Sequence, residues 1–251
     1  MIFVRNTPNN AGVAVYGDYN DFEGLYEALH DVVGDEGEYA HYEGARLRIL
    51  GVCYDLRHAL MGDRDYEFVE NGMDEDKRRK MSVLAPDCNL YLVVHVLWPE
   101  ILFVTMALNV FLEVYALKQV KASGSGELFD DKKVIWDKNI AQVRMLQAQL
   151  AETLQNTVSK NAYARIHNLL NDYHIMLIEY ITQYLDILNV RFLKMNKEKR
   201  LKNISISAKR IANPNEEYFF LMHQVRKEAD RLNCCAEDLR INLEYPEDID
   251  W

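Results

Sequence analysis

Two carboxylate and histidine pairs at helical spacing are the residues in this chain best suited to metal chemistry. Glu27 stands three positions before His30, and Asp55 stands three positions before His58. Pairs of this form on neighbouring helices hold metal ions in helical bundles. The helical angles oppose such a site, because Glu27 points away from the apolar face of its segment and His30 lies at the edge of that face. We therefore predict no metal and keep these four residues as the alternative.

A second polar group has the residue types of an enzyme site. Its members come from two expected helices and are Arg48, Asp55, His58, Asn109 and Glu113. Facing a cleft, they could serve a metal- or nucleotide-dependent enzyme, but such residues are more often an exposed edge or satisfied buried groups. The sequence contains no glycine-rich phosphate loop, nucleophile elbow or His-Glu-x-x-His motif. An enzyme is thus the alternative interpretation, and we predict no cofactor.

Basic residues cluster between positions 194 and 210. The candidates for contact with nucleic acid are Lys197, Lys199, Arg200, Lys202, Lys209 and Arg210. Clustered lysine and arginine is the pattern of a phosphate-binding surface. Aromatic residues do not interleave with this cluster, and the whole chain carries a formal charge of −10. We therefore favour a solvated connector, or an intramolecular partner for acidic residues, over nucleic-acid binding.

The acidic charge lies mainly in the first part of the chain. Residues 1–98 contain 18 Asp plus Glu against 9 Lys plus Arg, a net of −9, and the other residues contain 21 against 20, a net of −1. Such a field keeps a protein soluble and favours basic partners, so a basic protein partner for the first half stays open. No basic region followed by an apolar stretch opens the chain, and the four cysteines lack paired spacing. We expect reduced thiols and a cytoplasmic protein.

The most apolar run, residues 89–121, is predicted to be the centre of the fold. Its first part is dense in Leu and Val, which is typical of a buried strand, and Pro99 favours a helix start. On the helix that follows, Thr105, Asn109 and Glu113 form one narrow polar stripe, and apolar residues occupy the remaining surface. The uninterrupted apolar run is shorter than the ~20 residues of a membrane span, so we predict no membrane contact.

The overall pattern predicts an α+β fold, a small antiparallel or mixed sheet covered by helices and followed by a mostly helical part. The expected strands are 2–5, 12–17, 66–70 and 90–97, and the expected helices of the first part are 20–33, 43–61, 74–81 and 99–121. Residues 122–127, ASGSGE, have linker composition. We therefore expect an α+β domain over 1–121, a linker over 122–127 and a helical domain over 128–251.

The apolar pattern of residues 131–187 predicts a long antiparallel helical hairpin. Apolar residues form one stripe over 131–158, and a heptad seam over 166–187 includes Tyr173. The junction at 159–161 either turns or continues the helix. Apolar residues off the seam need a cover, which would be a third helix, the first domain or a second copy of the chain. A last strand over 239–245 could join the first sheet. The leading interpretation is a non-enzymatic interaction or regulatory module that dimerises through its helices.

Three segments resemble a known family. They are GDYNDFEGLYEALHDVVGDE, YEGARLRILGVCYDLRHALMGDR and VLWPEILFVTMALN. Together they look like an uncharacterised family of bacterial proteins known only as a domain of unknown function, over roughly the first half of the chain. The resemblance implies a bacterial, cytoplasmic origin, and it implies no activity and no catalytic residues.

Overall fold

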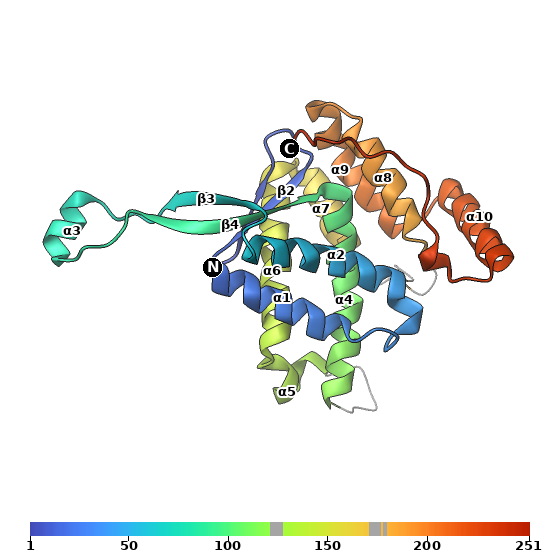
Figure 1. Cartoon of the computed structure of the whole chain (residues 1–251), viewed down its shortest axis with the longest axis horizontal. Helices are drawn as coiled ribbons and strands as arrows, with labels where there is room; N and C mark the ends of the chain where they lie inside the picture. Colours follow the sequence, from blue (N-terminus) through green and yellow to red (C-terminus); the bar gives the residue numbers. More distant parts are fainter. Residues whose placement is uncertain (121–127, 171–176, 178–179) are drawn as a thin grey trace.

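A four-stranded antiparallel sheet and a larger helical region make up the fold, which is α+β as predicted (Figure 1). The computed structural model describes residues 1–120, 128–170, 177 and 180–251. The strand order is β1-β2-β4-β3, and every pairing is antiparallel. The strands, all expected from the sequence, are β1 (Phe3–Asn6), β2 (Gly12–Gly17), β3 (Asp65–Glu70) and β4 (Cys88–Leu97).

Two helices cover the sheet, α1 (Tyr19–Val33) and α2 (Glu43–Leu60), lying side by side (Figure 1). Asp18 caps α1 by accepting a hydrogen bond from the Asp21 amide at 2.9 Å, and the side chain of Asp21 accepts from the Asp18 amide in return. Gly34, with φ of +73°, ends the helix in a conformation that glycine adopts without strain. Local sequence chemistry therefore sets both ends of α1.

The central helix is α4 (Trp98–Val120), and neighbours contact it on several sides. The indole of Trp98 donates to Oδ1 of Asn6 at 2.9 Å, which ties the helix start to β1. By length and composition α4 could cross a membrane, but 67% of its most apolar window is buried inside the chain. Its packing is that of a core helix, as predicted.

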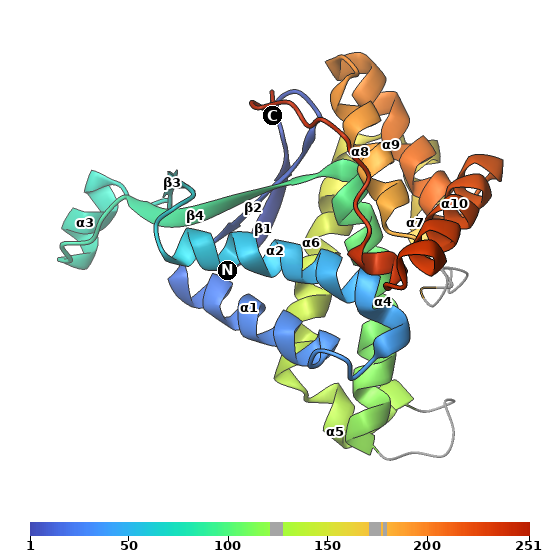
Figure 2. The same cartoon turned by 45° about the vertical axis from the view of Figure 1, so that its right-hand side comes forward.

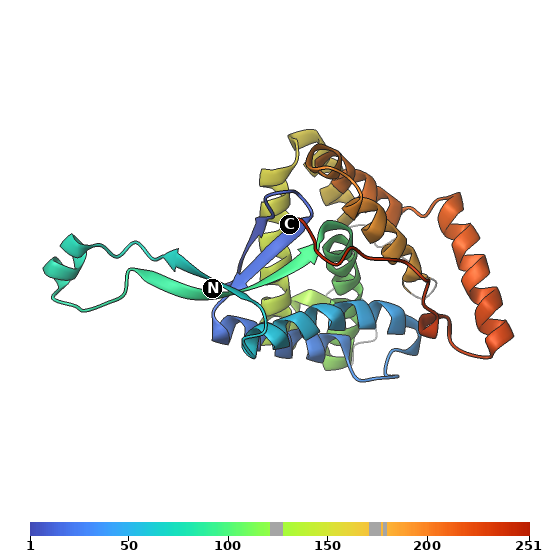
Figure 3. The same ribbon diagram turned by 45° about the horizontal axis from the view of Figure 1, so that its top comes forward.

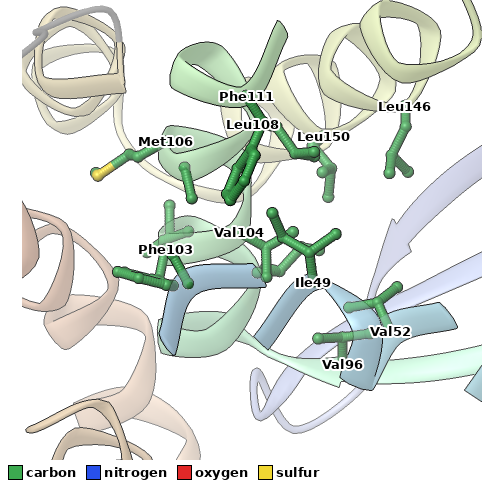
Figure 4. Packing of buried hydrophobic residues seen from close by; sticks show 14 of the residues in the cluster. Ile49, Val52, Val96, Phe103, Val104, Met106, Leu108, Phe111, Leu146 and Leu150 are labelled. Carbon is green, nitrogen blue, oxygen red and sulfur yellow. The ribbon is translucent and has the colours of Figure 1, made fainter. Parts of the chain in front are cut away.

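One hydrophobic core draws on both sides of residues 121–127. Figure 4 shows Ile49 and Val96 from the first part, Phe103 and Phe111 from α4, and Leu150 from the helical region within one cluster. Thr153 on the helical side also donates through Oγ1 to the carbonyl oxygen of Val4 at 2.8 Å. The two expected parts thus share a core, and the expected linker lies outside the described residues.

The helical region consists of α5 (Lys132–Ile135), α6 (Lys138–Thr157), α7 (Lys160–Leu170), α8 (Gln183–Leu193), α9 (Lys197–Ala212) and α10 (Glu216–Leu232). Val158 is extended, with φ of −105° and ψ of 166°, so the chain turns between α6 and α7. The second arm of the expected hairpin is not one helix, because Tyr180 and Ile181 lie between α7 and α8 without helical structure. The predicted seam position Tyr173 lies outside the described residues.

The prediction of a last strand over 239–245 is wrong, because the C-terminal tail, residues 239–251, contains no strand. It follows a short 3-10 turn (Ala236–Asp238) and runs back across the molecule to the loop between β1 and β2 (Figure 3). There the amide of Asn9 donates to the carbonyl oxygen of Trp251 at 3.0 Å. Alternating polarity alone does not make a strand, since each strand needs a hydrogen-bonded neighbour.

The arm, residues 65–91, projects away from the rest of the chain (Figures 1 and 2). Residues 92–97 of β4 pair with β2, whereas Cys88 to Tyr91 pair with β3 alone. The helix α3 (Glu75–Met81) forms the tip of the arm. The outer half of the sheet is therefore a two-stranded ribbon, and no other element among the described residues covers it.

Candidate functional site

Two adjoining clefts lie where α2, the start of α4, α8 and the C-terminal tail meet. Each has a volume of about 490 Å³, and both are lined by Arg48, Glu100 and Tyr245. We call the one that also contains Asn189 and Trp251 the tryptophan cleft. Four segments that are distant in sequence thus supply one polar site.

Arg48 is the hub of this site and lies on the polar side of α2, as predicted. Its Nη2 donates to Oδ2 of Asp186 at 2.6 Å and to the carbonyl oxygen of Thr182 at 2.9 Å, and its Nη1 lies 3.5 Å from Oε2 of Glu100. Burial opposes the charge of Arg48, but the two carboxylates outweigh burial and raise the pKa of the guanidinium. Arg48 is therefore a fixed cation with its donors directed at Asp186, Thr182 and Glu100.

Glu100 lies in the first turn of α4, where the helix dipole stabilises a negative charge. Asn189 donates through Nδ2 to its Oε2 at 2.7 Å. Desolvation by burial is the largest influence on the pKa of Glu100 and raises it, although Arg48 and Asn189 act in the opposite direction. Asn189 is 3% exposed, and its Oδ1 has no hydrogen-bond partner among the described residues. The site thus holds a destabilised carboxylate beside a buried acceptor.

The tail lines one side of the site. Tyr245 donates through its hydroxyl to Oδ1 of Asp186 at 3.1 Å, and burial together with that carboxylate raises the pKa of the phenol. Trp251 stacks on His95 with ring centroids 5.0 Å apart. Arg200 donates to the carbonyl oxygen of Asp250 at 2.8 Å, which anchors the end of the tail. Both aromatic walls of the tryptophan cleft therefore depend on the tail.

The predicted enzyme cluster is only partly brought together. Asp55 lines the tryptophan cleft, where its Oδ1 accepts from Nη2 of Arg64 at 2.8 Å. His58 lies outside both clefts, with its Nδ1 3.2 Å from Asp63 and its ring 4.2 Å from that of Tyr54. Sequence reasoning missed Glu100, Asp186, Asn189 and Tyr245 as members, because their spacing along the chain carries no motif.

Asn109 belongs to a separate polar contact between α4 and α6. Its Oδ1 accepts from Nη1 of Arg144 at 2.6 Å and from Nε2 of Gln147 at 3.1 Å, and its Nδ2 donates to the carbonyl oxygen of Leu170 at 2.8 Å. Gln147 also donates to the carbonyl oxygen of Thr105 at 2.9 Å. Thr105 and Asn109 of the polar stripe are thus satisfied groups in a helix contact. Half-buried Glu113 lies one helical turn further on and lines neither cleft.

The metal candidates are occupied by other contacts. Exposed Glu27 lies 4.0 Å from Nζ of Lys138. His30 packs on Tyr26, and burial, followed by the charge of Arg46, lowers the pKa of its imidazole. Across the described part of the chain, no three His, Cys, Asp or Glu side chains gather as a metal-binding group.

Arg200, one of the predicted nucleic-acid contacts in the basic segment, is buried. Arg200 is 6% exposed and donates to the carbonyl oxygens of Asn9, Asp250 and Leu193 at 3.2, 2.8 and 2.9 Å. Arg210 is half-buried, whereas the side chains of Lys197, Lys199, Lys202 and Lys209 are exposed on α9. Arg200 therefore acts as a structural anchor and is not available to a phosphate.

Comparison with curated proteins gives no match, and comparison with solved structures gives none either. A family model matches residues 2–251, so the similarity extends well beyond the first half of the chain. The family model is described only as a domain of unknown function and implies no activity. Over nearly its whole length, this chain belongs to the family of the domain of unknown function DUF6904.

Proposed function

We propose that this chain is a non-enzymatic protein-interaction module that self-associates through the arm. The observation that carries the proposal is the apolar face of the ribbon. In the register of the two strands, Phe68 stands opposite Leu90, and Tyr66 lies two residues from Phe68 on the same face. The exposed fractions of these side chains are 65% for Tyr66, 66% for Phe68 and 50% for Leu90.

A ribbon of this kind needs a cover. A two-stranded hairpin is at best marginally stable in water, and its open edges are templates for pairing with another chain. Met81, Val83 and Leu84, in the outer part of the arm, are also exposed. These features support an interface, because exposed apolar side chains that lie together mark protein contact sites.

Charge complementarity favours a second copy of the chain as the cover. The helix at the tip begins with the acidic residues Asp74 to Asp76 and ends in the basic run Lys77 to Lys80. Residues 18–43 contain no lysine or arginine, and their carboxylates are Asp18, Asp21, Glu23, Glu27, Asp31, Asp35, Glu36, Glu38 and Glu43. The start of α1, which belongs to this acidic surface, lies near the base of the arm (Figures 1 and 3).

A two-fold symmetric dimer would bring the apolar face of the arm, its basic tip and the acidic start of α1 into one interface. If the apolar faces of two arms pack together in opposite directions, each basic tip reaches the base of the other arm and meets the acidic start of α1. Such an interface uses the same surface of both copies, as two-fold dimers require. The basic partner expected for the acidic first half is then the arm of the second copy, and complementary charges set the register.

The helical surface supplies the competing interface. Much of the apolar surface of α6 to α9 packs into the shared core, but Phe219 and Phe220 on α10 are 53% and 68% exposed. Dimerisation through helices would therefore use α10.

All four cysteines are unpaired, which supports a reducing compartment such as the cytoplasm.

Two matched substitutions test the proposal. Phe68 and Phe220 are almost equally exposed, so Phe68→Ser and Phe220→Ser remove the same side chain from the two candidate interfaces. Light scattering on the full-length chain over a dilution series should show the dimer dissociation constant rising about tenfold or more for Phe68→Ser, as expected for an aromatic anchor. It should be unchanged for Phe220→Ser. The reverse pattern would assign the contact to α10, and a monomeric wild type at micromolar concentration would reject self-association.

A further inference from the structure

We propose that the tryptophan cleft binds a small organic cation, a primary amine or diamine, with Glu100 as its counter-ion. The inference does not depend on self-association, because the cleft lies between α2, α8 and the tail of one chain.

Acceptor atoms without donors support this assignment. Oδ1 of Asn189 is buried without a partner, and none of the hydrogen bonds among the described residues reaches Oε1 of Glu100. An ammonium group has three donors and no acceptor. It would donate to both oxygens, and its positive charge would stabilise the ionised form of Glu100, which burial disfavours.

The charge balance of the cleft favours a cationic ligand over an anionic one. Its carboxylates are Asp55, Asp65 and Glu100, and its arginines are Arg48 and Arg64. Both arginines are already engaged, Arg64 with Asp55 and Arg48 with Glu100 and Asp186. An anionic ligand would have to break these pairs, whereas a cation meets a net negative lining in a chain whose formal charge is −10.

The aromatic walls suit the same ligand. Trp251 and Tyr245 line the cleft, and a cation over the face of such rings is attracted by their quadrupoles. Burial lowers the pKa of His95, which favours the neutral form of the ring that stacks on Trp251, and a neutral ring does not repel a cation. The volume of about 490 Å³ lies within the range of small-molecule sites. Because the tail supplies both aromatic residues, ligand binding should also hold the tail in place.

Calorimetry on the full-length chain tests the assignment with 1,4-diaminobutane as the probe and 1,4-butanediol as the uncharged control. The diamine should bind and the diol should not. Glu100→Gln keeps the size of the side chain and should weaken the diamine about tenfold or more, since a charge-assisted bond is lost. Trp251→Ala should weaken it severalfold through the lost ring. Glu198→Gln, an exposed change on α9, should leave the affinity unchanged.

Thermal melting of each variant controls for folding, and Trp251→Ala provides the second test if Glu100→Gln unfolds the chain. The proposal is overturned if the diamine does not bind, or if a folded Glu100→Gln or Trp251→Ala variant binds it as tightly as wild type. Tighter binding of inorganic phosphate than of the diamine would also overturn it.

Discussion

The side-chain amide of Asn189 donates to the carboxylate of Glu100 over 2.7 Å and thereby joins α8 to the first turn of α4. Arg48 reaches the same carboxylate from α2. Three helices therefore meet at one acid, whose side chain is 15% exposed. This acid is held in place by polar contacts, yet burial still disfavours its charge.

The stability of the wild type relative to Glu100→Gln should depend on pH in a defined direction. The folded-state pKa of Glu100 is raised above its ordinary value of 4.5, so its stabilising contribution is complete below that value and is lost as pH rises through the folded pKa. The groups that face it are Arg48, Asp186, Asn189 and Tyr245. The variant lacks this titration.

Melting temperatures of the two proteins from pH 4 to pH 8 provide the measurement. The difference, variant minus wild type, should be largest at the alkaline end and should shrink steadily toward pH 4.5, the ordinary value for Glu100. A difference that stays constant across the range would contradict a raised pKa at Glu100.

Removal of the Arg200 side chain should strongly destabilise the fold. Arg200→Ala leaves the carbonyl oxygens of Asn9, Asp250 and Leu193 without this donor. We expect a loss of about 3 kcal/mol in the free energy of unfolding, measured by urea denaturation. Lys199→Ala removes an exposed charge from the same helix and should change the free energy by less than about 0.5 kcal/mol. Equal losses for both variants would contradict an anchoring role for Arg200.

The cysteines should differ sharply in reactivity. Cys53 is 1% exposed in α2, and burial raises the pKa of its thiol to about 12, whereas Cys234 and Cys235 are exposed. The thiolate is the reactive form, so a disulfide reagent at pH 8 should modify Cys234 and Cys235 quickly and Cys53 only on unfolding. Mass spectrometry of the labelled peptides identifies each site. Rapid labelling of Cys53 in the native chain would be inconsistent with the packing of α2.

Local signals were sufficient for the sheet and the first helices. Asp18 and Gly34 mark the ends of α1, and the apolar run before Pro99 correctly predicts β4 leading into α4. These features depend on neighbours within a few positions. They are therefore visible without knowledge of the fold.

The polar site could not be predicted in full, because its members meet only after the chain has packed. Arg48 and Asp186 are 138 positions apart, and Tyr245 joins them from the tail. No spacing along the sequence encodes such contacts. Arg48 and Asp55 were found because they share the polar side of one helix.

The heptad seam predicted burial correctly at most of its described positions, but it did not predict the break in the helix. Ile166, Tyr180 and Tyr184 are all buried, yet they lie in α7, outside any helix and in α8, respectively. Apolar spacing reports which residues face the core. It does not report where the backbone changes direction between them.

Sedimentation velocity on the full-length chain tests self-association through the arm most directly. The variants reverse the charges at the tip and then reverse the facing charges on α1 to restore the contact. At micromolar concentration the wild type should sediment with twice the mass of one chain. Arg79→Glu with Lys80→Glu should produce monomers, and adding Glu23→Lys with Glu27→Lys should restore the dimer. Lys199→Glu with Lys202→Glu makes the same change in net charge on α9 and should leave the dimer intact. A monomeric wild type, or a dimer that survives reversal at the tip, would contradict the proposal.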